Sequence, residues 1–77
     1  MRKLRRLRDL REDADLSQKQ IADVLGTSVQ YYQKYESGVR PITVERLELL
    51  ADYYKTSVDY LLGRTDVREA YPNGKRK

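Results

Sequence analysis

The chain has 77 residues, with 16 Lys and Arg against 12 Asp and Glu, and a net charge of +4. This length gives one small domain with a small core and little room for a catalytic cleft. The sequence contains neither His nor Cys, so the usual zinc ligands, thiol nucleophiles and histidine bases are absent together. No run approaches the ~20 apolar residues that span a bilayer, and no signal peptide is visible. We therefore expect a cytoplasmic protein that is not an enzyme, has no membrane partner and uses no metal or cofactor.

The first expected helix covers roughly residues 2–13, because leucines recur there at helical spacing and form one apolar stripe. The stripe consists of Leu4, Leu7 and Leu10. Arg11 falls on the core-facing edge of this helix. A short acidic turn at residues 13–15 follows, and Asp15 separates this helix from the next.

A second helix is expected between Ser17 and Gly26. Ser17 with Gln20 three residues later forms a capping box, and Leu16 with Ile21 forms a hydrophobic staple across the same helix start. Gly26 offers the left-handed conformation that ends a helix. The start of this helix is therefore fixed to within about one residue.

Ser28 is the natural N-cap of a third helix, expected over about residues 29–36. The second and third helices are joined by a short turn that contains Gly26. Two short helices joined in this way are typical of a helix-turn-helix, whose second helix can lie in the major groove of DNA.

The two sides of the third helix differ in chemistry. At about 100° per residue, its inward side holds Val29, Tyr32, Tyr35 and Glu36. Gln30 and Lys34 fall on the opposite side, and the residues that flank them are Tyr31, Gln33 and Ser37. These side chains can reach base edges or phosphates, and the amides have the geometry that pairs with adenine. The alternative is an ordinary solvated polar face, which most helices have.

Two further helices are expected after a loop at residues 38–41, because Pro41 cannot continue a helix. Thr43 caps the fourth helix, and Ser57 caps a short fifth helix that Gly63 closes. The expected core residues of these helices are Leu47, Leu50, Ala51, Tyr54, Val58, Leu61 and Leu62. The resulting fold class is all-α, a compact five-helix bundle.

The charge is unevenly distributed along the chain. Residues 1–12 carry a net charge of +4 and residues 64–77 carry +3, whereas the segment between them sums to −3. Affinity for phosphates would therefore come from Lys34, Arg40, the two termini and the helix N-termini. The alternative is that the terminal charges only keep a small protein in solution. We divide the chain into a helix-turn-helix domain at residues 1–63 and a basic, flexible tail at residues 64–77.

Taken together, these motifs resemble the Cro/cI-type helix-turn-helix domain of the xenobiotic-response-element family of bacterial and phage repressors. The resemblance covers about residues 4–63. It is carried by LRED at 10–13, LSQKQIADVLGTS at 16–28, YESG at 35–38 with Arg40 and Pro41 after it, ERLELLADYY at 45–54, and SVDYLLG at 57–63. It implies a lambda-repressor-like fold and a sequence-specific regulator of transcription, a repressor, that reads the major groove with the third helix.

The resemblance also implies roles for single residues, and these agree with most of the angular positions. The candidate DNA contacts are Gln18, Ser28, Val29, Gln30, Tyr31, Gln33, Lys34, Ser37, Arg40 and Thr43. Family members place a salt bridge at the positions of Arg11 and Glu36, so we expect a partly buried ion pair between them. Asp15 stands where the family often has Gly or Asn, and Asp tolerates left-handed geometry less well.

A homodimer on a two-fold DNA operator is expected, because one such domain contacts too few base pairs to be selective. Two alternatives stay open. The chain could be the antitoxin of a toxin–antitoxin pair that also binds its own operator, with the toxin as a protein partner. It could also be a helical protein-interaction module that has lost DNA binding, which the acidic middle segment allows. The neighbouring gene would test the first alternative, and a gel shift would test the second.

Overall fold

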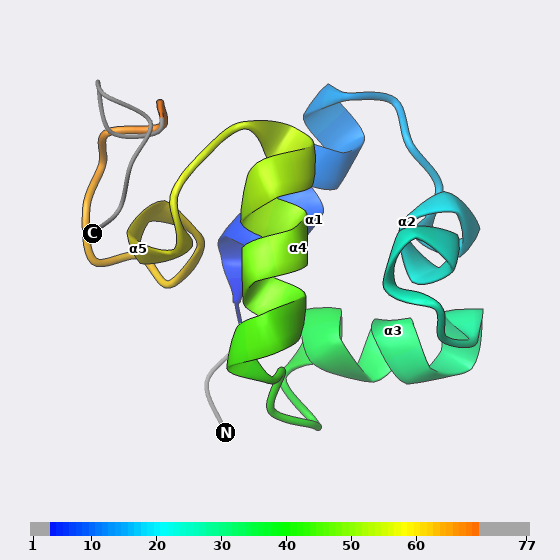
Figure 1. Cartoon of the computed structure of the whole chain (residues 1–77). Coiled ribbons are helices and arrows are strands. Elements are labelled where there is room, and N and C mark those ends of the chain that lie inside the picture. The colour runs from blue at the N-terminus through cyan, green and yellow to red at the C-terminus, as the bar shows by residue number, and fades with distance from the viewer. Residues whose placement is uncertain (1–3, 70–77) are drawn as a thin grey trace.

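A computed structural model describes residues 4–69 of the chain, and within them the secondary structure is entirely helical. The helices are α1 (Arg5–Asp13), α2 (Gln18–Leu25), α3 (Val29–Ser37), α4 (Val44–Tyr54) and α5 (Val58–Leu61) (Figure 1). The predicted all-α, five-helix fold is confirmed. None of the helices in the described range is long and apolar enough to cross a membrane. The basic residues at positions 2, 3 and 75–77 lie outside the described residues.

Four of the helices begin at the hydroxyl caps that the sequence predicts. The caps are Ser17, Ser28, Thr43 and Ser57, and each side chain accepts a hydrogen bond from the backbone N–H three residues later. At Ser17 the bond is reciprocated, because Gln20 Oε1 accepts from the Ser17 backbone N–H at 2.8 Å. These bonds satisfy N–H groups that the first turn of a helix leaves unpaired. The N-terminal ends of α2 to α5 are therefore set by hydrogen bonds between residues close in the sequence.

The first helix begins later than predicted. Leu4, which falls inside the predicted helix at residues 2–13, is its N-cap, and α1 starts at Arg5. Leu4 makes no side-chain capping bond, because leucine has no acceptor. The spacing of the leucines indicates a helix but carries no signal for its first residue.

Several of the segments that connect the helices contain a residue in the left-handed backbone conformation. Gly26 has a φ of +72° between α2 and α3, as predicted. Asp15 has a φ of +59°, and Lys55 after α4 has a φ of +58°. Asp15 therefore adopts the conformation that the family usually gives to Gly or Asn. Nothing in the sequence indicated the conformation of Lys55.

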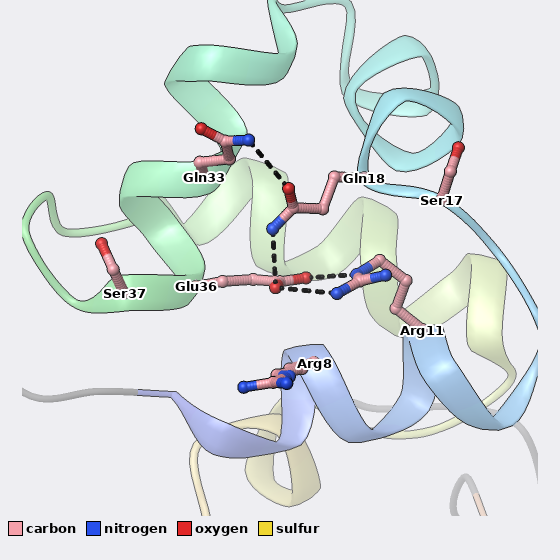
Figure 2. A pocket seen from close by; sticks show the side chains of 7 residues that line it. All are labelled: Arg8, Arg11, Ser17, Gln18, Gln33, Glu36 and Ser37. Atoms are coloured by element: carbon pink, nitrogen blue, oxygen red, sulfur yellow. Dashed lines mark hydrogen bonds and ion pairs between the residues drawn. The ribbon is translucent and has the colours of Figure 1, made fainter.

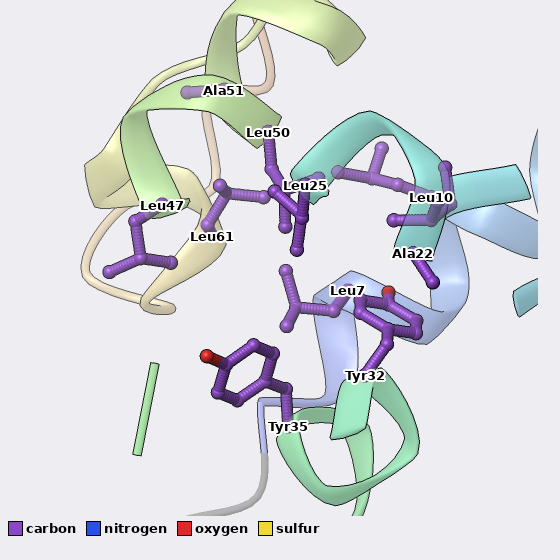
Figure 3. Packing of buried hydrophobic residues seen from close by; sticks show 11 residues of the cluster. Leu7, Leu10, Ala22, Leu25, Tyr32, Tyr35, Leu47, Leu50, Ala51 and Leu61 are labelled. Carbon is purple, nitrogen blue, oxygen red and sulfur yellow. The ribbon is translucent and has the colours of Figure 1, made fainter. Parts of the chain in front are cut away.

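Each helix contributes one side to the hydrophobic core (Figure 3). Its buried apolar residues are Leu7, Leu10, Ile21, Ala22, Leu25, Tyr32, Tyr35, Leu47, Leu50, Ala51 and Leu61. Three residues predicted for the core, Tyr54, Val58 and Leu62, are only partly buried and pack against its edge. In this core α2 packs against α3 and α4, while α1 packs against α3 and α5.

The segment after α5 contacts α1 through residues 65 and 66. Arg6 donates hydrogen bonds to the carbonyl oxygens of Tyr60 and Thr65 and pairs with Asp66 at 2.8 Å. Its guanidinium also lies 4.1 Å from the centre of the Tyr60 ring. The Thr56 hydroxyl bonds the carbonyl of Arg68. Residues of the expected tail therefore contact the folded helices, because a polar segment can still offer carbonyl oxygens to an arginine. The domain boundary after residue 63 stays a prediction.

Candidate nucleic-acid interface

The outer face of α3 is polar and open to solvent. Gln30, Gln33, Lys34 and Ser37 are exposed, and we call these four residues the outer face. On the opposite side, Tyr32 and Tyr35 are buried in the core. The α3 helix lies along one end of the bundle and follows α2 directly (Figure 1). Its polar side is therefore free to meet a large partner, as the angular analysis predicted.

The remaining candidate contacts surround this outer face and differ in exposure. Ser28 and Thr43 are exposed, but their hydroxyls accept capping bonds from Tyr31 N–H and Arg46 N–H. Val29 and Tyr31 are only partly buried and pack against the core. The N-termini of α3 and α4 therefore reach solvent, and Val29 and Tyr31 also have packing roles.

Two arginines lie near the ring of Tyr31, which is in the first turn of α3. The guanidinium of Arg40, an exposed residue, lies 5.5 Å from the centre of the Tyr31 ring. Arg46 lies 5.8 Å from the same ring and donates to the Tyr35 hydroxyl at 2.7 Å. Cations over aromatic faces are attracted by the ring quadrupole. Arg46 was not predicted, because only the tertiary fold brings the first turn of α4 to these tyrosines.

Arg11 and Glu36 form the ion pair that the family resemblance implied. Arg11 Nε donates to Glu36 Oε2 at 2.7 Å, and the side chains are 13% and 6% exposed. Burial alone would raise the pKa of the Glu36 carboxyl, but the hydrogen bonds from Arg11 and Gln18 outweigh burial and lower this pKa. The hydrogen bond to Glu36 also raises the pKa of Arg11. The pair joins α1 to α3 in its charged form.

Two glutamines extend this ion pair toward solvent (Figure 2). Gln18 Nε2 donates to Glu36 Oε1 at 3.1 Å, and Gln33 Nε2 donates to Gln18 Oε1 at 2.9 Å. The sequence predicted Gln18 and Gln33 as separate DNA contacts and gave no sign that they bond each other. We call the series from Arg11 through Glu36 and Gln18 to Gln33 the amide chain.

The amide chain forms part of the wall of an open groove of about 580 Å³ between α1, α2 and α3. Its lining residues are Arg8, Arg11, Ser17, Gln18, Gln33, Glu36 and Ser37. Arg8 was not predicted, although it lies one helical turn before Arg11, and its Nε donates to Glu12 at 2.9 Å. Across residues 4–69 no group of carboxylates is arranged to hold a metal ion.

Several known transcriptional regulators are similar in sequence to this chain. The profile of the Helix-turn-helix family matches residues 7–61. The HTH-type transcriptional regulator AnsR of Bacillus subtilis is 41% identical over 69 residues, which cover 90% of this chain and 60% of AnsR. The cryptic phage CTXphi transcriptional repressor RstR of Vibrio cholerae is 42% identical over 59 residues, covering 77% of this chain and 53% of RstR. The chain thus spans little more than half the length of these curated relatives. No solved structure matches it.

Proposed function

Because the chain belongs to the Cro/cI-type helix-turn-helix family, we propose that it binds double-stranded DNA sequence-specifically and represses transcription. The observation that carries this proposal is the outer face of α3, which is polar and exposed, while the opposite side is anchored in the core. A helix held in this way can enter the major groove, which admits an α-helix and displays a distinct pattern at each base pair.

In this proposal each candidate residue has a role that follows from its place. Gln30, Gln33 and Lys34 face the bases, and Val29 and Tyr31 offer apolar contact to thymine methyl groups. The residues placed at the DNA backbone are Gln18, Ser28, Ser37, Arg40 and Thr43. Three of the five lie at helix N-termini, where backbone N–H groups and the helix dipole favour a phosphate.

We further propose that two copies bind one operator, since a single domain contacts too few base pairs for selectivity. AnsR is named a transcriptional regulator and RstR a transcriptional repressor. These names favour regulation over the antitoxin and interaction-module alternatives. A repressor of this kind would act in the cytoplasm, where bacterial DNA lies.

Selection of bound duplexes from a random pool tests the proposal. The expected result is enrichment of a two-fold symmetric sequence whose half-sites lie about 10 base pairs apart, or a multiple of that spacing. A gel shift at fixed salt should then favour the enriched duplex over random duplex by about 10³-fold or more. Equal binding of all duplexes, or no binding, would contradict the proposal.

A further inference from the structure

The amide chain fixes which atom of Gln33 faces a bound partner. We infer that Gln33 presents its carbonyl oxygen outward and so reads a base with an exocyclic amino group, adenine or cytosine, in the major groove. This inference rests on the proposed function and names a specificity-determining residue, together with Gln18 and Glu36 as positioning residues. The donors and acceptors of the four side chains allow this one orientation of the two amides.

The direction of the amide chain is set at its buried end. A guanidinium only donates hydrogen bonds, and a carboxylate only accepts them. Glu36, held by Arg11 at 2.7 Å, therefore requires a donor from Gln18. Gln18 meets this requirement with Nε2, at 3.1 Å from Glu36 Oε1. The opposite orientation would place the carbonyl oxygen of Gln18 against a carboxylate oxygen.

The orientation of Gln33, at the exposed end of the amide chain, is set by donors and acceptors in the same way. Since the NH₂ group of Gln18 is turned toward Glu36, its carbonyl oxygen faces Gln33, which must donate. Gln33 Nε2 does so at 2.9 Å. The Gln33 carbonyl oxygen then points away from Gln18 (Figure 2). No side chain or backbone N–H in residues 4–69 donates to that oxygen.

The position of Gln33 makes this oxygen available to DNA. Gln33 is exposed, and it lies about 60° around α3 from Gln30, which faces directly outward. A carbonyl oxygen has no hydrogen to offer to a phosphate, so Gln33 is a poor backbone contact. Adenine N6 and cytosine N4 are donors in the major groove, whereas guanine O6 and thymine O4 are acceptors. The outward oxygen therefore favours A or C over G or T.

Gln30 differs from Gln33 in that no hydrogen bond within the described residues fixes its amide. It lies on the same outer face, and its side chain makes no hydrogen bond within residues 4–69. Its amide can therefore rotate and meet either kind of base edge. The preference expected at the position read by Gln33 is a consequence of the amide chain and not of glutamine as such.

Selection from a random duplex pool, repeated with point variants, tests the inference. In the wild type, one position of each half-site should be A or C, and replacing it with G or T should weaken binding about 5- to 10-fold. Gln33→Ala should abolish the preference at that position. Gln33→Lys, which can only donate, should reverse it toward G or T. Both changes are at an exposed site, and thermal unfolding checks that the variants fold.

Gln18→Ala tests the positioning role, and Gln30→Ala is the matched control. Without Gln18 the Gln33 amide can rotate, so the preference at the same position should fall below about 2-fold. A merely structural role for Gln18 would weaken all duplexes equally and leave the preference unchanged. Gln30→Ala should keep the preference read by Gln33 and alter a different position.

The outcomes that overturn the inference differ from those that overturn the proposed function. If Gln33→Ala keeps the wild-type sequence profile, or if the position it controls is G or T in the wild type, Gln33 does not read an amino group. An unchanged preference in Gln18→Ala would remove the positioning role of the amide chain. If the wild type binds no duplex selectively, the proposed function fails, and this inference fails with it.

Discussion

At the scale of single residues, the backbone of Lys55 carries the clearest cost. Its φ of +58° places a long side chain in the left-handed region, which costs roughly 1–2 kcal/mol for an L-residue other than Gly. Lys55→Gly should therefore raise the free energy of unfolding by about 0.5–1 kcal/mol, after the greater freedom of Gly in the unfolded chain is subtracted. Urea denaturation measures the difference.

Asp15 and an alanine control make this prediction specific. Asp15 has a φ of +59°, but Asp tolerates the left-handed region better than Lys does. Asp15→Gly should accordingly stabilise the domain less than Lys55→Gly. Lys55→Ala removes the side chain and keeps the strained conformation, so it should bring no gain. Equal gains from Ala and Gly would show that the backbone is not the source.

The exposed amide of Gln30 carries a second residue-scale prediction. Because Gln30 projects from α3 opposite the buried Tyr32, Gln30→Ala should cost about 1–3 kcal/mol of binding free energy on the selected operator. Binding to random duplex should change little. Competition gel shifts with the two duplexes measure both quantities, and equal losses on both would remove Gln30 from base recognition.

At the scale of elements, the Arg11–Glu36 pair joins α1 to α3. Glu36 is 6% exposed and Arg11 is 13% exposed, so removing one partner leaves a buried charge without its counterion. Glu36→Gln and Arg11→Met should each destabilise the domain by ~3–5 kcal/mol, whereas an exposed pair would cost under about 1 kcal/mol. Thermal unfolding of the singles and the double variant gives the coupling. Small, additive losses would mean that the pair does not hold the helices together.

The same pair makes stability depend on pH. The pKa of Glu36 is lowered in the folded protein, because hydrogen bonds from Arg11 and Gln18 outweigh the opposing effect of burial. A depressed carboxyl pKa contributes stability that is fully present above the unfolded value of about 4.3 and is lost as pH falls through the folded pKa. The melting temperature should therefore drop below about pH 4.5 in the wild type.

Glu36→Gln isolates this contribution, because its amide does not titrate. The acid-dependent fall in melting temperature should be shallower in Glu36→Gln than in the wild type when both are measured between about pH 6 and 3. Glu48→Gln makes the same change at an exposed site in the middle of α4 and should follow the wild-type curve. Parallel curves for all three proteins would refute the role of Glu36.

The elements also show which parts of the fold a sequence can reveal. The four hydroxyl caps were predicted because each bond joins residues three positions apart, so the signal is local. The start of α1 has no such bond and was misplaced. The pairing of Arg11 with Glu36 was expected from helix geometry and the family resemblance together. The caps need no knowledge of how distant segments pack, whereas the Arg11–Glu36 pair joins residues 25 positions apart and was expected only because the family resemblance supplied the partner.

Other contacts could not be read from the sequence, because they depend on packing between distant segments. Gln33 and Gln18 are 15 positions apart, and Arg6 and Asp66 are 60 apart. Glutamines and arginines on exposed positions are ordinary surface residues until the fold brings particular ones together. The amide chain therefore emerges only from the structure, although each of its residues had been singled out.

At the scale of the whole molecule, most basic residues lie outside the segment that forms α2 to α5. The middle segment that carries α2 to α5 sums to −3, and the basic residues concentrate before and after it. An acidic body repels DNA except where a few cations face it, so these cations decide both affinity and orientation. We expect Arg40 to be one of them, because it is exposed and lies between the end of α3 and the exposed N-terminus of α4.

The effect of removing Arg40 on the salt dependence of binding should reveal how many copies of the chain bind one operator. Its guanidinium rests near the Tyr31 ring at 5.5 Å, which holds it beside the outer face of α3, where the DNA backbone would pass. Each phosphate contact contributes about 0.9 to the slope of log binding constant against log salt concentration. Arg40→Ala should lower the slope by about 0.9 for one bound copy and by about 1.8 for a homodimer, and should weaken all duplexes alike. Lys55→Ala removes the same charge at the C-terminal end of α4, the opposite end of that helix from the N-terminus beside Arg40, and should leave the slope unchanged. An unchanged slope in Arg40→Ala would make Arg40 a solvated loop residue, and a fall of only about 0.9 would argue against two copies on the operator.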